Sequence, residues 1–184
     1  MAKSHVEVGV CGLSCRLCPR YHTDGSSRCG GCKGEFRMGA GCPFITCAVK
    51  RKGIEYCGDC PEKGACDKWK LHRERGKSHD SFVCYQKLDQ NIAHIEKSGI
   101  DAFDEEQKNR ERLLSIMLRE FNEGRSKNYY CIAATVLEPA ELEEAISKSR
   151  AVSKGKGDKL RSKALHEELE AIAERRGYLL KLRK

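Results

Sequence analysis

Ten of the twelve cysteines in this chain fall between Cys11 and Cys66, and the other two stand alone further on. The stretch that holds the ten is rich in glycine and shows little apolar periodicity. Such a segment cannot bury enough apolar surface to offset the entropy that it loses on ordering. Some other kind of bond must hold it together, and the clustered sulfurs are the available source.

Whether these sulfurs form disulfide bonds or bind metal depends on the cellular compartment. The sequence begins MAKSHVEVGVCGLSC, which lacks the apolar core of a secretory signal peptide. No stretch approaches the roughly 20 apolar residues that span a bilayer. We therefore expect a cytoplasmic protein without a membrane segment, in a compartment that keeps thiols reduced. There, a dense cysteine cluster indicates metal binding.

The spacing of the cysteines points to zinc. Three pairs have the Cys-x2-Cys spacing, which lets two sulfurs reach one ion at about 2.3 Å, and two such pairs complete a tetrahedral site. We expect two zinc ions, because ten sulfurs are more than two four-sulfur sites need. The sequence leaves open whether consecutive or alternate pairs share an ion. The candidate metal ligands are Cys11, Cys15, Cys18, Cys29, Cys32, Cys42, Cys47, Cys57, Cys60 and Cys66.

An iron–sulfur cluster is the alternative to zinc. Cys11-x3-Cys15-x2-Cys18 has the spacing with which radical S-adenosylmethionine enzymes hold a [4Fe–4S] cluster. The chain is too short for the barrel of those enzymes, and it lacks the alternation of strands and helices that builds a barrel. A cluster held by these three cysteines and a distant fourth would instead serve electron transfer or redox sensing.

Histidines and isolated cysteines are weaker candidates for metal binding. A histidine could replace a sulfur, but four of them lie in polar surroundings that favour an ordinary surface position. Cys84 and Cys131 have no histidine near them in sequence, and Cys131 lies in an apolar helical pattern, so we expect both to be buried small residues. The four histidines are His5, His22, His72 and His79.

The cysteine motifs also resemble a known family. CGLSCRLCP at 11–19, CGGC at 29–32 and CPFITCAVKRKGIEYCGDC at 42–60, with the closing Cys66, resemble a cysteine-rich prokaryotic family of unknown function. NEGRSKNYYC at 122–131 is similar to a stretch that some members carry after the cysteines. The resemblance implies a metal-binding module, taken in that family to hold zinc, and it implies no reaction. The chain departs from the family pattern just before Cys66, where members have Phe-Pro.

Beyond the cysteines the apolar pattern becomes helical, so we expect a mainly α protein. A loop-rich, metal-binding module at 1–70 would precede a connector at 71–84 and a small α-helical domain at 85–184. The connector belongs to a polar and mostly basic run over 67–80. One short helix, over 44–52, is expected inside the module.

Helix ends in the second half are marked by capping residues. Gly99, Gly124 and Gly177 follow apolar-periodic runs and predict helix ends, and Pro139 predicts a helix start. The four residues 104–107 match a capping box, which predicts a further helix start. Ser126 is placed to cap the helix after it.

The sequence constrains partners and reaction only loosely. It contains no HExxH, GxSxG or GxGxxG motif, so we leave enzymatic activity, substrate and oligomeric state open. Two four-thiolate zinc sites would lower the net charge from +8 to +4, which weakens the case for nucleic acid. A protein or nucleic-acid partner could contact the basic residues at 50–52. The basic C-terminal tail and residues 124–127 fit solvated helix ends and a helix cap better than an anion site.

Overall fold

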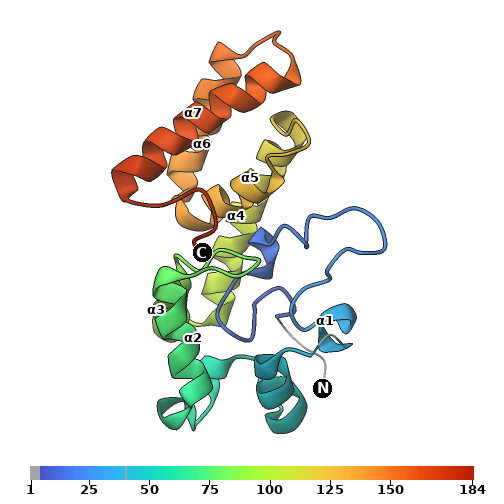
Figure 1. The fold of residues 1–184 in the computed structure, drawn as a ribbon, viewed down its shortest axis with the longest axis vertical. Coiled ribbons are helices and arrows are strands. Elements are labelled where there is room, and N and C mark those ends of the chain that lie inside the picture. Colours follow the sequence, from blue (N-terminus) through green and yellow to red (C-terminus); the bar gives the residue numbers. More distant parts are fainter. Residues whose placement is uncertain (1–4, 40) are drawn as a thin grey trace.

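The computed structural model describes residues 5–39 and 41–184, and it is mainly α-helical, as the sequence predicts (Figure 1). The described residues contain no strand, only an isolated bridge between Val8 and Ser14. None of the described helices is long and apolar enough to cross a membrane. The helices are α1 (Glu35–Gly39), α2 (Asp67–Ser78), α3 (Leu88–Ser98), α4 (Ile100–Glu120), α5 (Lys127–Val136), α6 (Pro139–Val152) and α7 (Asp158–Arg176). Shorter turns are η1 (Cys15–Leu17), η2 (Ile45–Arg51), η3 (Cys57–Asp59) and η4 (Lys63–Ala65).

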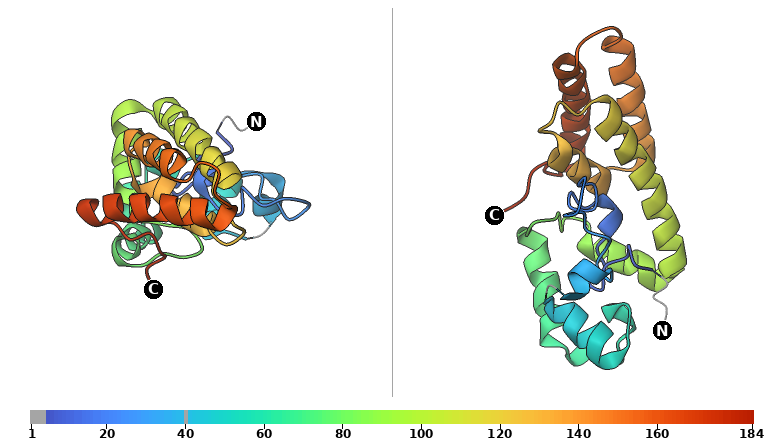
Figure 2. Two further views of the ribbon diagram at one scale, coloured as in Figure 1. Left: turned by 90° about the horizontal axis from the view of Figure 1, so that it is seen from above. Right: turned by 90° about the vertical axis from the view of Figure 1, so that its right-hand side faces the viewer.

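Helix α4 connects two hydrophobic cores. At about 1.5 Å per residue its 21 residues span roughly 30 Å. Near its start, Phe103 packs with residues of α2 and α3, including Trp69 and Ile92. Near its end, Leu114 and Met117 join the larger core made with α5, α6 and α7. Figure 2 shows the result, an elongated molecule with the α6–α7 pair at one end and α2 at the other.

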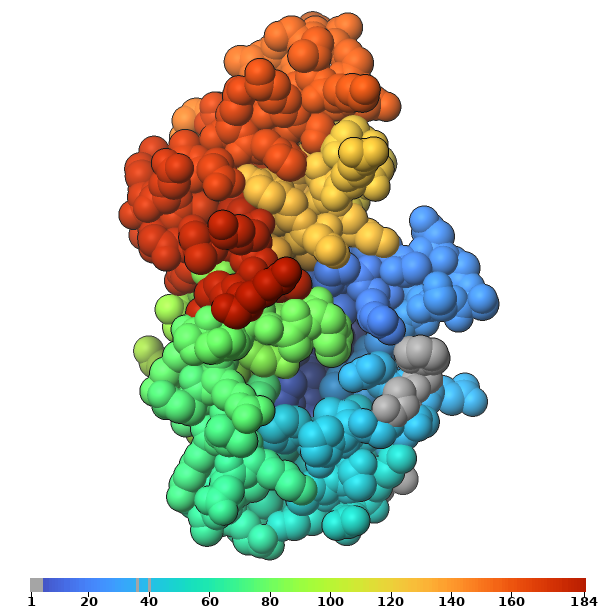
Figure 3. Space-filling model, in the orientation of Figure 1, coloured from blue at the N-terminus to red at the C-terminus, as the bar shows by residue number. Residues whose placement is uncertain are grey.

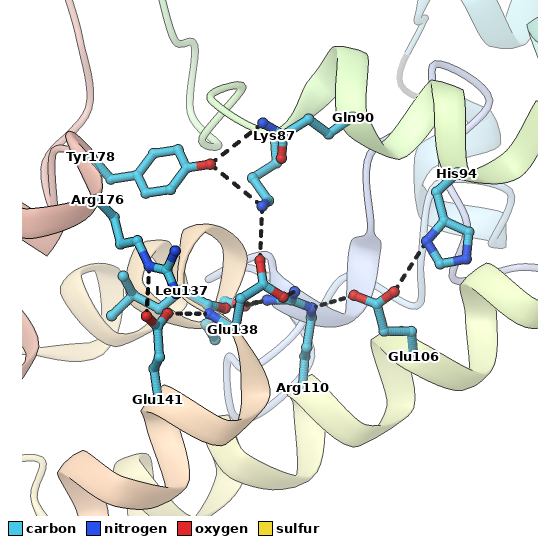
Figure 4. A network of polar contacts seen from close by, with 11 residues as sticks. Lys87, Gln90, His94, Glu106, Arg110, Leu137, Glu138, Glu141, Arg176 and Tyr178 are labelled. Carbon is cyan, nitrogen blue, oxygen red and sulfur yellow. Dashed lines mark hydrogen bonds and ion pairs between the residues drawn. The ribbon is translucent and has the colours of Figure 1, made fainter. Parts of the chain in front are cut away.

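A buried arginine ties the two cores together. Arg110 on α4 donates hydrogen bonds to Glu106 at 2.9 Å, to Glu138 at 3.0 Å and to the backbone carbonyl of Leu137. Lys87, which precedes α3, reaches the same Glu138 at 3.0 Å. Figure 4 shows how this network brings α3, α4 and the start of α6 together. The charges satisfy one another, which is the condition for keeping a guanidinium buried.

Several helix ends lie where the capping residues predict them. Gly99, with φ 86°, follows α3, and Gly177, with φ 72°, follows α7. Pro139 is the first residue of α6, whose N-cap residue Glu138 forms a capping box with Glu141. The helix predicted over 44–52 is present as η2, wound as a π-helix.

Two predictions of local structure are wrong. The capping box at 104–107 does not start a helix, because Asp104 lies inside α4 and binds Arg16 at 3.0 Å. The basic run at 67–80 is not a plain connector, since most of it forms α2. One face of α2 is buried and carries Trp69 and Gly76. The high average polarity of the segment hides this face in the sequence.

The last residues of the C-terminal tail pack against the segment between α2 and α3, whereas Arg175 and Arg176 lie exposed in the last turn of α7, as a solvated helix end does. Arg183 donates to the Asp80 carboxylate at 2.9 and 3.0 Å through two nitrogens, and its backbone N–H donates to the same group at 2.7 Å. It also donates to the carbonyls of Gly76 and Lys77. Leu180 adds an apolar anchor in the larger core.

The cysteine-rich part of the chain has a much smaller apolar core. Val10, Ile45 and Ala48 form its central cluster. The Cys57 backbone N–H donates to the carbonyl of Val10 at 2.9 Å and so connects the start of this region to its end. Gly58 follows directly, and a Cβ there would lie 2.2 Å from the ring of Tyr56, so only glycine fits.

Candidate metal centres

The ten clustered cysteines line two adjoining cavities, and each of the ten belongs to one cavity only. Pro43 and Phe44 line both cavities and so form the wall between them. We call them the six-cysteine cavity, of about 350 Å³, and the four-cysteine cavity, of about 410 Å³. The first is lined by Cys11, Cys15, Cys18, Cys29, Cys32 and Cys42. The second is lined by Cys47, Cys57, Cys60 and Cys66.

This division favours one of the two pairings of the Cys-x2-Cys pairs that the sequence leaves open. The first two Cys-x2-Cys pairs, at 15–18 and 29–32, face the same cavity. The third, at 57–60, faces the other cavity together with Cys47 and Cys66. Consecutive pairs are therefore brought together, and the cross-braced arrangement is not seen.

Short turns position the sulfurs of the four-cysteine cavity. The Cys60 N–H donates to the carbonyl of Cys57 at 3.2 Å and closes the turn η3. Cys66 follows η4, and Cys47 lies within η2. The ammonium of Lys52 lies 3.8 Å from the Cys60 sulfur and places a positive charge beside the group.

A backbone contact between the first two pairs shapes the six-cysteine cavity. The Cys32 N–H donates to the Cys15 sulfur at 3.1 Å. The loop between Cys29 and Cys32 passes through Gly31, which has φ 100° and lies against the backbone of Val6. A Cβ at Gly31 would lie 2.6 Å from the Val6 carbonyl oxygen, so this close approach requires glycine.

Burial raises the pKa of three of these thiols, those of Cys11, Cys18 and Cys57, and a hydrogen bond with Cys32 together with burial raises the pKa of Cys15. Burial raises the pKa of Cys11 to about 12, and the nearby Cys32 and Cys42 add to the effect. Burial likewise raises the pKa of Cys57 to about 12, with Cys66 as its strongest sulfur neighbour. Cys32 is the exception, because a hydrogen bond from Cys15 lowers its pKa to about 6. A bound cation would reverse the general trend, since it stabilises thiolates.

The sulfurs are neighbours around each cavity without forming a finished coordination sphere. Within residues 5–39 and 41–184, no three His, Cys, Asp or Glu side chains converge closely enough to hold a metal ion as they stand. All twelve cysteines are free thiols. The donors nevertheless suit a soft metal, because both cavities supply several sulfurs each.

His72 is the residue that the sequence analysis placed wrongly. It lines the six-cysteine cavity, and its ring packs 4.8 Å from Phe44 and 5.3 Å from Tyr85. Burial lowers its pKa, although a hydrogen bond with the Cys11 backbone opposes the shift. Trp69, His72 and Gly76 recur at helical spacing along α2, and this pattern is the signal that predicts a packed face.

The other three histidines are not at either cavity. His79 lies exposed at the end of α2 and contacts Ser78. His5 pairs with Asp101 at 3.4 Å, and His22 contacts the carbonyl of Arg16. Their prediction as ordinary histidines therefore agrees with their surroundings.

An exposed aromatic ring borders the six-cysteine cavity. Phe82, in the segment between α2 and α3, is 52% exposed and lines the cavity. The guanidinium groups of Arg20 and Arg37 lie 5.9 and 5.5 Å from its ring centre, within cation–π range. Figure 3 shows this face, in which the dark blue N-terminal residues lie recessed between the green and cyan segments.

The remaining candidates have local roles. Cys84 and Cys131 are buried in the larger core, as predicted. Ser126 precedes α5 as expected, but its hydroxyl donates to Glu123 at 2.7 Å and does not cap the helix. Lys52 pairs with Glu62 at 2.6 Å, so part of the basic patch at 50–52 is neutralised within the chain.

Comparison with known proteins adds no relative. No family model, no curated protein and no solved structure matches this chain. The resemblance of the cysteine motifs to a prokaryotic family therefore stays a prediction. The case for function depends on the site itself.

Proposed function

We propose that the chain is a cytoplasmic metal-binding protein, with a binding or regulatory role, whose cysteines hold two metal centres. The supporting observation is the division of all ten clustered cysteines between two adjoining cavities. The loop-rich segment that carries them would be a metal-binding module, because its own apolar cluster of Val10, Ile45 and Ala48 is small. Metal–thiolate bonds would supply the stability that this core lacks.

Zinc is the metal that best suits the four-cysteine cavity. Its four sulfurs equal the number in a closed tetrahedral zinc site. Four thiolates and one zinc ion leave a net charge of about −2. The ammonium of Lys52 lies 3.8 Å from the Cys60 sulfur, and it also pairs with Glu62. A closed site of this kind stabilises a fold and performs no chemistry.

The six-cysteine cavity would hold the second centre, and we again favour zinc. An iron–sulfur cluster is the second candidate here for a specific reason. Cys11, Cys15 and Cys18, whose spacing suits a [4Fe–4S] cluster, all line this cavity. Three further cysteines are present for the fourth position, which the sequence spacing alone does not provide. Such a cluster would serve electron transfer or redox sensing.

Metal analysis of anaerobically purified protein tests this proposal. We expect about two zinc ions per chain and a colourless solution. Iron together with acid-labile sulfide and a broad visible absorption band would favour the cluster in the six-cysteine cavity. A folded, reduced protein with neither metal would contradict the proposal.

The partner is the least defined part of the role. Lys50 and Arg51 are exposed and lie on η2, which also carries Cys47 of the four-cysteine cavity. A metal-stabilised module would present them in a fixed arrangement to an acidic protein surface or to nucleic acid. Replacing both with glutamate should weaken such binding without lowering the metal content.

A further inference from the structure

One histidine, His72, lines the six-cysteine cavity together with the cysteines. His72, on α2, reaches it from a part of the chain that follows all ten clustered cysteines. Its Nε2 atom is buried and has no hydrogen-bond partner among the described residues. A buried polar nitrogen without a partner is unfavourable, and such an atom calls for a specific explanation.

The imidazole is held in place by its neighbours. Phe44 lies 4.8 Å from it, Tyr85 5.3 Å and Trp69 6.1 Å, measured between ring centres. These three rings come from η2's N-cap position, from the segment before α3 and from α2 itself. A ring packed on several sides cannot easily turn its Nε2 atom out to water.

The cavity wall beside His72 also carries cysteines. The backbone of Cys11 lies next to the imidazole. Cys32 and Cys42 are close enough to Cys11 to interact with it electrostatically. His72 therefore lines the same cavity as sulfurs that are already near one another, and nitrogen is a regular companion of sulfur in metal sites.

We propose that Nε2 of His72 is a ligand of the metal in the six-cysteine cavity, which then has a mixed sulfur and nitrogen coordination. This inference rests on the proposed function, because it requires a metal in that cavity. A neutral imidazole in place of one thiolate makes a zinc site less negative by one charge. Where an iron–sulfur cluster is bound, replacing sulfur by histidine raises the reduction potential.

The two centres would then differ in kind. The four-cysteine cavity has four sulfurs and no histidine among its lining residues. The six-cysteine cavity has more sulfurs than one ion uses, together with a nitrogen donor. The first suits a permanent structural ion, and the second suits a centre whose ligands can exchange.

Cadmium-113 NMR on protein labelled with nitrogen-15 in its histidines tests this ligand directly. The native metal of anaerobically purified protein is exchanged for cadmium-113, and each bound ion gives its own resonance. A bond from nitrogen-15 to cadmium splits that resonance. We expect one split resonance and one unsplit resonance in the unaltered protein.

Three variants complete the experiment. His72→Gln should remove the splitting and lower cadmium retention at that centre. His72→Cys supplies a sulfur in place of the nitrogen, so it should retain the cadmium ion but lose the splitting. It keeps the test valid if His72→Gln fails to fold. His79→Gln is the matched control, because His79 directly follows the same helix but is exposed, and it should leave the spectrum unchanged.

The outcomes separate this inference from the proposed function. Cadmium resonances without any splitting in the unaltered protein would show all-sulfur centres, which overturns the role of His72 and leaves metal binding intact. Splitting that persists in His72→Gln would assign the nitrogen to another histidine and also overturn it. Failure to retain any cadmium would contradict the proposed function, and this inference with it.

Discussion

The two halves of the molecule are held together by different means. The helical half buries a continuous core that extends over α4, α5, α6 and α7. The cysteine-rich half has a cluster of its own of three buried residues, Val10, Ile45 and Ala48, and it adds Val8 and Tyr56 to the core shared with α2 and α3. Short turns and close backbone approaches connect the rest. The comparison teaches that two regions of one chain can require different sources of stability. Apolar burial accounts for the order of the first region, whereas for the second we propose bonds to metal.

Removing one metal ligand should have the largest effect in this comparison. Cys57→Ser takes away one of the four sulfurs of the four-cysteine cavity, and the metal content should fall by about one ion per chain. Local order around 42–66 should be lost with it, because a structural site contributes most of the folding free energy of such a segment. Metal analysis and limited proteolysis measure both effects.

Cys84→Ala is the matched control for that variant. Cys84 is buried in the larger core and lines neither the four-cysteine nor the six-cysteine cavity. The metal content of this variant should equal that of the unaltered protein. A loss of metal in Cys84→Ala as large as in Cys57→Ser would remove the distinction between the two halves.

Breaking the buried arginine network should have the next largest effect, which is a loss of stability in the helical half. Arg110→Ala removes the hydrogen bonds to Glu106, Glu138 and the Leu137 carbonyl. We expect the free energy of unfolding to fall by about 3 kcal/mol, with the metal content unchanged. Denaturant unfolding followed by circular dichroism measures the change.

The control for Arg110 is its exposed neighbour on the same helix. The side chain of Arg112 is 56% exposed and pairs with Glu143 at 2.6 Å. Arg112→Ala should therefore cost less than about 1 kcal/mol. Equal losses of unfolding free energy in the two variants would mean that the buried network of Arg110 stabilises the fold no more than an exposed ion pair.

Acid should detach the C-terminal tail from Asp80, and we expect this effect to be smaller than those of the Cys57 and Arg110 variants. Burial alone would raise the pKa of Asp80, but the hydrogen bonds from Arg183 outweigh it and hold this pKa below its usual range. A carboxyl with a lowered pKa stabilises the folded state above its unfolded pKa of about 3.9, and it loses this contribution as the pH falls further. The tail should therefore detach below about pH 4.

Hydrogen exchange at the Arg183 amide can follow this detachment. Asp80→Asn should weaken the anchor at neutral pH by roughly 1–3 kcal/mol and flatten its dependence on acid. Asp89→Asn is the control. Asp89 pairs with Arg73, its side chain is 40% exposed, and its replacement should leave the tail unchanged. An acid response that survives in Asp80→Asn would assign the effect to another group.

Local signals in the sequence predict the helical half well. Gly99, Pro139 and Gly177 each mark a helix end or start because their backbone preferences act within one turn. Asp104 shows where such signals fail. Its carboxylate matches a capping box, but Arg16, 88 residues earlier in the chain, binds it inside α4. A contact across that separation leaves no trace in the local pattern.

The candidate site is only partly predictable for the same reason. The Cys-x2-Cys spacing indicates the candidate donors, because it depends on one turn of backbone. Their division into six and four depends on distant contacts, such as the hydrogen bond from Cys57 to Val10. His72 is missed because the average polarity of α2 hides the face formed with Trp69 and Gly76.

Hydrogen exchange of the reduced protein, with and without bound metal, tests the central claim most directly. We predict that the amides of residues 11–66 are protected only when metal is bound, while those of α4 to α7 are protected in both states. Equal protection of residues 11–66 in reduced, metal-free protein would show that this half folds without metal, and it would contradict the account.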